Sequence, residues 1–76
     1  MTLTYDLRHN IAYIRLRESV EQVETIRVSD EMNVDLAPDG TIYGIELLNA
    51  NQQLGSGELL VLNETSGARS SVKLPI

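Results

Sequence analysis

The stretch VDLAPDGTIYGIELL, Val34–Leu48, decides the fold because it joins a tight turn to two strand-like flanks. Its centre, Ala-Pro-Asp-Gly, places Pro38 at the first central position of a type I turn and Gly40 at the left-handed position that follows. Such a turn predicts a hairpin with a three-residue loop and a glycine bulge. We therefore expect two antiparallel strands in this stretch, with Ala37 opposite Thr41.

Continuing this register along the hairpin pairs Leu36 with Ile42, Asp35 with Tyr43 and Val34 with Gly44. One face then holds Met32, Val34, Leu36, Ile42, Gly44, Glu46 and Leu48, and the other holds Asn33, Asp35, Tyr43, Ile45 and Leu47. Because both faces carry apolar residues, we expect the hairpin to be central in its sheet and covered on both sides. A glycine inside a strand also indicates close approach by another group, so Gly44 is interpreted as a place where a side chain such as Tyr13 crosses the backbone.

The first segment of the chain is typical of another hairpin. TLTYDL (Thr2–Leu7) and IAYIRLR (Ile11–Arg17) are rich in strand-forming residues and are separated by three polar residues. A type I turn centred on the first two of these puts Asn10 at a left-handed position that Asn tolerates. The resulting register pairs four residues, Leu7 with Ile11 and Tyr5 with Tyr13.

A third strand is predicted over Val23–Ser29, with one weakly apolar side. Alternation places Glu24, Ile26 and Val28 on one face and Val23, Thr25 and Arg27 on the other. A helical interpretation of ESVEQVETI (Glu18–Ile26) is the alternative, and the strand is preferred because Val, Thr and Ile dominate the segment from Val23 on.

The last third of the chain is less regular. LNANQQLGSG (Leu48–Gly57) is typical of a polar connection with one helical turn. SGELLVLNET (Ser56–Thr65) fits either a short helix capped by Ser56 or a buried strand, and periodicity does not separate them. SSVKLPI (Ser70–Ile76) predicts an edge strand whose pairing ends at Pro75.

Length and composition predict one domain, residues 1–76, of the mainly β class. The expected fold is an antiparallel meander of about five to six strands built from consecutive hairpins, with one or two short helical turns after residue 49. A β-rich α+β fold is the alternative. The chain has no Cys, Phe or Trp, so a core of this size supplies roughly 3–5 kcal/mol at best. Extra burial in a homo-oligomer is therefore expected.

Charge and targeting signals narrow the expected partners and location. The formal net charge is −5 and the isoelectric point is near 4.6, whereas binding to nucleic acid or anionic lipid needs a basic patch. We therefore expect no nucleic-acid partner and no membrane association. The first ten residues lack the layout of a signal peptide, which predicts a cytoplasmic protein.

Five short motifs in this order resemble a small prokaryotic family catalogued as domain of unknown function 2283. They are Tyr5-Asp6, Ala12-Tyr13-Ile14, Val34-Asp35, Asp39-Gly40 and Gly44-Ile45-Glu46-Leu47. The resemblance covers about Thr4 to Leu54, and in that family the first turn usually closes with Asp where this chain has Asn10. It implies a compact β-rich domain and no assigned activity. Residues 55–76 are interpreted from their own sequence.

Glu46 is the sharpest candidate for chemistry, because the predicted register places its carboxylate beside apolar residues, where the pKa of a carboxyl group rises. The competing interpretation is that Glu46 pairs with an arginine such as Arg15 or Arg17, or reaches solvent. A cleft between subunits could gather Glu46, Asp35 and Tyr43, although the predicted faces send Glu46 away from the other two. These three are the candidate binding residues, and no catalytic residue is assigned.

The remaining polar residues predict structural roles. His9, the single histidine, lies in a predicted turn, and without cysteines it cannot complete a zinc site of the usual kind. The acidic residues Asp30, Glu31, Asp35 and Asp39 fail the spacing of a calcium-binding loop. No metal site and no cofactor are therefore expected.

Two hypotheses of function follow. The first, which is favoured, is a non-enzymatic interaction domain that self-associates or caps a partner by adding strands at an exposed edge. An antitoxin-like variant would use the acidic surface to neutralise a small basic toxin. The second is a small enzyme or ligand-binding module with a site around Glu46 at a subunit interface.

Overall fold

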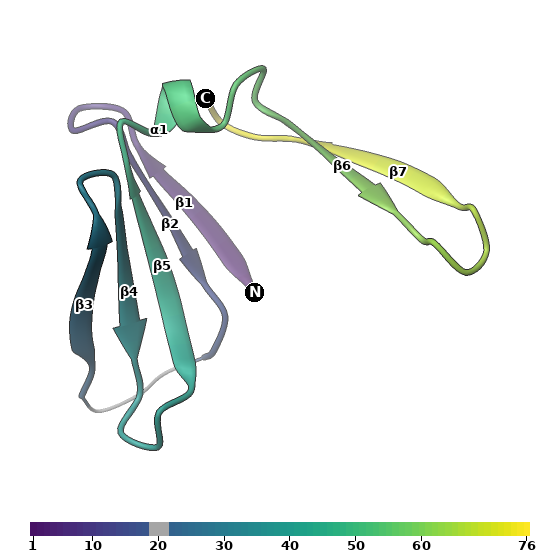
Figure 1. The fold of residues 1–76 in the computed structure, drawn as a ribbon. Helices are drawn as coiled ribbons and strands as arrows, with labels where there is room; N and C mark the ends of the chain where they lie inside the picture. Colours follow the sequence, from purple (N-terminus) through teal and green to yellow (C-terminus); the bar gives the residue numbers. More distant parts are fainter. Residues whose placement is uncertain (19–21) are drawn as a thin grey trace.

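A computed structural model describes residues 1–18 and 22–76 of the chain (Figure 1). Over these described residues the structure is mainly β, as predicted, with seven strands and one short helix. Their bounds are β1 Thr2–Asp6, β2 Ile11–Arg15, β3 Glu24–Ser29, β4 Met32–Leu36, β5 Ile42–Leu48, α1 Ala50–Gln53, β6 Glu58–Leu62 and β7 Arg69–Lys73.

The first five strands form one antiparallel sheet in the order β1-β2-β5-β4-β3. The hairpins β1–β2, β3–β4 and β4–β5 were all predicted. The expectation of a simple meander was wrong at one step, because β2 pairs with β5 and β3 therefore lies at the far edge of the sheet. Residues 24–29 are strand, and the part of the alternative helix over residues 19–21 lies outside the described residues.

The first hairpin has a different register from the predicted one. Asn10 is left-handed, with φ 54°, as expected, but Tyr5 faces Ala12 and Asp6 faces Ile11. The loop is one residue longer than predicted because the Asp6 side chain closes its own turn. Asp6 Oδ1 accepts hydrogen bonds from the backbone N–H groups of Arg8 (3.0 Å) and His9 (3.3 Å), as Asp side chains do when they initiate turns.

The second hairpin follows the prediction near its turn and departs from it further along. Ala37 N–H donates to the Thr41 carbonyl at 2.8 Å, and Leu36 faces Ile42. The register then shifts by one residue, so that Asp35 faces Gly44 rather than Tyr43. Beyond this point each β4 residue therefore shares a face with the β5 residues that the predicted register put on the opposite face. A slip of one residue always has this effect.

The shifted register separates the two faces of the sheet more cleanly than the sequence predicted. We name the apolar face by the side chains that cross-strand pairing places together, which are Leu3, Tyr5, Ala12, Ile14, Ile26, Met32, Val34, Ile45 and Leu47. The polar face carries Thr2, Thr4, Tyr13, Arg15, Thr25, Arg27, Asn33, Asp35, Gly44 and Glu46. The sequence predicted that both faces of the hairpin would be covered, because each predicted face carried apolar residues. That expectation was wrong, because those mixed faces occur only in the predicted register and not in the observed one.

The core lies where α1 packs on one end of the apolar face. It consists of Ala12, Leu47 and Ala50, with partly buried residues around them. The helical turn, which was predicted, is held by Gln53, whose Nε2 donates to the carbonyl oxygens of Leu48 (2.6 Å) and Glu31 (2.8 Å). Among described residues only four apolar ones are buried, and three of these are alanines.

The C-terminal segment resolves the helix-or-strand alternative in favour of a strand. β6 and β7 form a two-stranded antiparallel sheet of their own, and Figure 1 shows this hairpin projecting away from the five-stranded sheet. The expectation of a buried strand was wrong, because every residue of β6 and β7 is exposed. Pro75 follows β7, where pairing was predicted to end.

Asn10 connects the first turn to α1. Its Oδ1 accepts hydrogen bonds from the Tyr5 hydroxyl (2.9 Å) and the Asn51 backbone N–H (3.0 Å). Its Nδ2 donates to Asn51 Oδ1 at 2.8 Å, and its backbone carbonyl accepts from Ala50 N–H at 3.0 Å. Left-handed backbone and side-chain bonding together suit Asn at this position.

We expect Asn10→Ala to lower the free energy of unfolding by about 1–3 kcal/mol, because it strains the left-handed backbone and removes four side-chain hydrogen bonds. Asn10→Asp, which keeps both accepted bonds, should cost less. Urea unfolding followed by circular dichroism measures both. Equal losses for the two variants would contradict this role of the accepted bonds.

Candidate functional site

The polar face is organised around Tyr13, which reaches across a neighbouring strand. Its phenol starts on β2, crosses β5 and donates a hydrogen bond to Asp35 Oδ2 on β4 at 2.7 Å. Asp35 also accepts a hydrogen bond from Thr25 Oγ1 on β3 at 2.6 Å. The Asp35 carboxylate therefore links β2, β3 and β4, and the Tyr13 side chain that it binds crosses β5.

Gly44 is the residue that Tyr13 crosses, as the sequence predicted. A Cβ atom at this position would lie 2.2 Å from the Tyr13 hydroxyl oxygen and 2.5 Å from Cζ. Both distances are far below van der Waals contact, so any side chain here displaces the phenol. Gly44 is buried. Its φ is not positive, so the backbone conformation does not explain the glycine, whose role is to leave room for the Tyr13 side chain.

Glu46 lies next to this bridge and is bound differently from the prediction. Its Oε1 accepts a hydrogen bond from Asn33 Nδ2 at 2.9 Å, and the two residues face each other in the β4–β5 register. The predicted ion pair with Arg15 or Arg17 was wrong, since no such contact occurs among the described residues. An amide, not a guanidinium, is the partner of this carboxylate.

The three candidate binding residues share one side of the sheet. Asp35 and Glu46 face Gly44 and Tyr13 in register. Tyr43 lines a shallow hollow beside them, together with Thr2, Thr4, Tyr13 and Arg15. The expectation that Glu46 projects away from the other two was wrong, because the register shift between Asp35 and Leu36 reverses the face of Asp35.

Sequence reasoning placed Tyr13 over Gly44 but did not include it among the candidate binding residues, although it is the centre of this group. The signal that indicates it is Gly44, a glycine with no turn around it in the middle of a strand. Burial raises the pKa of the Tyr13 phenol, and the hydrogen bond to Asp35 and the charges of Asp35, Tyr43 and Glu46 raise it further. Tyr13 therefore stays protonated at neutral pH and acts as a hydrogen-bond donor, not as a base.

The other predicted polar residues occupy turns. His9 is exposed, and its Nδ1 lies 2.7 Å from Asp6 Oδ2, an interaction that lowers the pKa of the Asp6 carboxyl. Hydrogen bonds from Thr41 lower the pKa of Asp39, the turn residue of the second hairpin. His9 and Asp39 therefore have the structural roles in turns that the sequence predicted.

The acidic cluster is dispersed by the fold. Asp30 pairs with Arg27, and Glu31 Oε2 accepts a hydrogen bond from Asn49 at 3.1 Å, while Asp35 belongs to the polar face. Within residues 1–18 and 22–76, no three acidic, histidine or cysteine side chains gather as metal ligands do.

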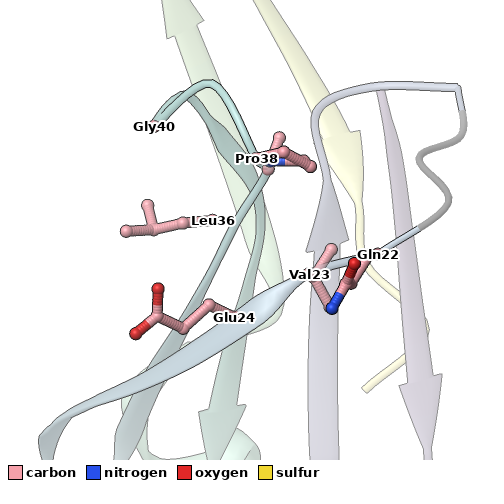
Figure 2. A pocket seen from close by; sticks show the side chains of 7 residues that line it. Gln22, Val23, Glu24, Leu36, Pro38 and Gly40 are labelled. Atoms are coloured by element: carbon pink, nitrogen blue, oxygen red, sulfur yellow. The ribbon is translucent and has the colours of Figure 1, made fainter.

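A second hollow, of about 330 Å³, lies between β3 and the β4–β5 turn. Figure 2 shows Glu24 and Leu36 projecting on the same side of the β3–β4 pair at its border. Val23, Ala37 and Pro38 also line it. Glu24 is its charged side chain, Gln22 adds a polar amide, and the other lining residues are apolar or glycine. The β4–β5 turn lies at the end of the sheet away from α1 (Figure 1).

The described part of the chain contains no helix long and apolar enough to cross a membrane. Its fold and its polar face define a small β domain with a hydrogen-bonded network of carboxylates, hydroxyls and amides.

The family model DUF2283, described as protein of unknown function, matches residues 2–51. The chain belongs to this family, which confirms the resemblance read from its motifs. Comparison with curated proteins and with solved structures gave no match.

We expect Gly44→Ala to lower the free energy of unfolding by about 1–3 kcal/mol, because the methyl group displaces Tyr13 and breaks its bond to a part-buried carboxylate. In a Tyr13→Ala background the same substitution should cost far less, since the clash is gone. A double-mutant cycle from urea unfolding measures this coupling. Additive costs would show that the crossing does not determine the need for glycine.

The raised pKa of Tyr13 also predicts a pH dependence. The folded-state pKa lies above the unfolded value of ~10, so the stabilisation is complete below that pH and is lost as pH rises toward the folded-state pKa. The stability advantage of the wild type over Tyr13→Phe should therefore shrink above about pH 10. Urea midpoints for both proteins at several pH values test this, and a constant difference through pH 11 would rule it out.

Proposed function

We propose that this protein is a small, acidic, non-enzymatic interaction domain that self-associates through the apolar face of its five-stranded sheet. The observation that carries the proposal is the shortage of buried apolar surface. α1 packs on one end of the apolar face, where Ala12 and Ala50 are fully buried. At the far edge of the same face Ile26 is 42% exposed.

Energetics favour a covered face over an open one. Burial of apolar surface contributes about 25 cal/mol per Å², and a chain of this length buries a smaller fraction of its surface than a longer chain does. Residues such as Leu3, Val34 and Ile45 are only partly buried within one chain. A second copy covering them adds stability that depends on protein concentration.

The β3 edge of the sheet is less suitable for association than the apolar face. Residues 27–29 of β3 contain a register irregularity, and its edge carries Glu24 and the Arg27–Asp30 pair. Charges and irregularities of this kind discourage edge-to-edge pairing. The cross-strand row from Leu3 on β1 to Ile26 on β3 consists of uncharged side chains, and Glu24 lies on the same side at the outer end of β3.

The bonding of the polar face supports a structural rather than a catalytic role for its carboxylates. Asp35 accepts two hydroxyl hydrogen bonds and Glu46 accepts one amide hydrogen bond. Acid–base chemistry needs a carboxyl group free to exchange a proton with a substrate. Here both groups hold strands together.

The acidic charge allows a basic protein as a further partner, as in the antitoxin-like variant. Nine of the eleven acidic residues and four of the six basic residues precede Gly55, so the net negative charge belongs to residues 1–54. A small basic toxin would be attracted by this field.

A ligand-binding module or enzyme with a site around Glu46 is the second candidate function. It is supported by the common side of Asp35, Tyr43 and Glu46 around Tyr13. A site completed by another subunit would require copies to meet through the polar face. The two candidates therefore predict different association surfaces.

Two matched substitutions distinguish these surfaces. We expect Ile26→Lys, on the apolar face, to weaken self-association at least tenfold, because it places a charge in the interface. Thr4→Lys, on the polar face and with the same change of charge, should leave association unchanged. Sedimentation velocity over a range of concentrations measures both. A monomeric wild type would overturn self-association, and loss of assembly only in Thr4→Lys would favour the second candidate.

A further inference from the structure

The β6–β7 hairpin, Glu58–Lys73, which we call the arm, has no core of its own. Its two strands pair only with each other, and its apolar side chains are each about half exposed: Leu59 46%, Leu60 45%, Val61 47%, Leu62 56% and Val72 52%. An isolated two-stranded hairpin is marginally stable at best in water. The arm needs a surface to pack on.

The two faces of the arm differ in charge. Cross-strand pairing puts Leu59, Val61, Ser70 and Val72 on one face, which has no charged residue. The opposite face contains Glu58, Leu60, Leu62, Arg69, Ser71 and Lys73. The first of these, the uncharged face, is suited to an apolar partner surface.

The five-stranded sheet offers such a surface. Leu3, Ile14, Ile45, Val34 and Ile26 form one continuous cross-strand row over all five strands, which we call the apolar row. The row lies beside the small core under α1 and consists of five aliphatic side chains, with Glu24 on the same side next to its β3 end.

The base of the arm is fixed so that the arm points away from its own sheet (Figure 1). Gly57 N–H donates to the Leu54 carbonyl at 3.2 Å, and Leu74 N–H donates to the Gly57 carbonyl at 2.6 Å. Gly55 and Gly57 both have positive φ, at 59° and 74°. Folding back onto the same chain would break these bonds and change this backbone, whereas a second copy can meet the arm as it stands.

Building on the proposed self-association, we propose that two copies form a reciprocal dimer in which the uncharged face of each arm packs on the apolar row of the other copy. Each copy supplies one arm and one apolar row. In a dimer with a two-fold axis both arms therefore pair with both rows, and the assembly is closed. A standard stable interface buries about 1,600 Å² in total, and the reciprocal arrangement doubles the area that a single contact between one arm and one apolar row supplies.

Cysteine cross-linking tests this arrangement cleanly, because the chain has no cysteine. Val61→Cys protein is mixed with Ile26→Cys protein, or with Val34→Cys protein, and oxidised under mild conditions. Because each protein carries one thiol, a disulfide between the two different variants must join two chains. Thr4→Cys, on the polar face, is the matched control.

We expect at least about tenfold more mixed disulfide from Val61→Cys with an apolar-row variant than with Thr4→Cys, at concentrations where sedimentation shows a dimer. A dimer without the preferential cross-link would overturn the arm exchange while leaving self-association standing. A monomer in sedimentation would overturn both. Oxidation of the double variant Val61→Cys/Ile26→Cys to a cross-linked monomer would show that the arm folds back on its own chain, which also overturns the exchange.

Discussion

The hydrogen bond from Tyr13 to Asp35 across Gly44 is the contact on which the sheet depends. It fixes β2 and β4 on either side of β5, and Thr25 extends it to β3 through the same carboxylate. A phenol can take this path only where the central strand has no side chain. The position of Gly44 opposite Asp35 therefore selects one register out of those that the hairpin sequence allows, and that register determines which side chains share a face.

Separation of the faces has an energetic consequence. On the polar face Asp35 binds Tyr13 and Thr25, and Glu46 binds Asn33. None of the described buried side-chain polar atoms lacks a partner. The apolar face is not satisfied in the same way, because α1 is a single turn and packs on one end. The same register that completes the polar network thus leaves an aliphatic surface for which the proposed dimer supplies the missing layer.

The second turn and the left-handed Asn10 were predictable from the sequence, whereas the register of the first hairpin and the pairing between distant segments were not. Pro38 and Gly40 define their turn within a few residues, so Ala37–Thr41 and Leu36–Ile42 were correct. Asn10 was likewise read from its own turn. The slip after Leu36 could not be read locally, since it depends on Tyr13, which is more than twenty residues away.

The same limit applies to the candidate site and to the last third of the chain. Glu46, Asp35 and Tyr43 were identified by residue type, but their common side follows from the β2–β5 and β4–β5 registers together. A run such as ELLVL has no period that separates strand from helix. Its pairing with Arg69–Lys73 decides the matter, and that partner lies beyond a turn that sequence reasoning did not specify.

The alanines of the core explain why this domain is thin. Ala12 and Ala50 are fully buried because a small residue on each side lets α1 approach the sheet closely, but small residues also contribute little apolar area. Without Phe or Trp, no single side chain in this sequence can fill the space that a second layer would occupy. Aliphatic residues on the arm are the remaining source of apolar surface, and in one copy they point away from the sheet. The small residues thus lie where α1 contacts its own sheet, and the larger aliphatic residues lie where the proposed exchange takes place. This distribution of side-chain size favours a core that is completed between two chains.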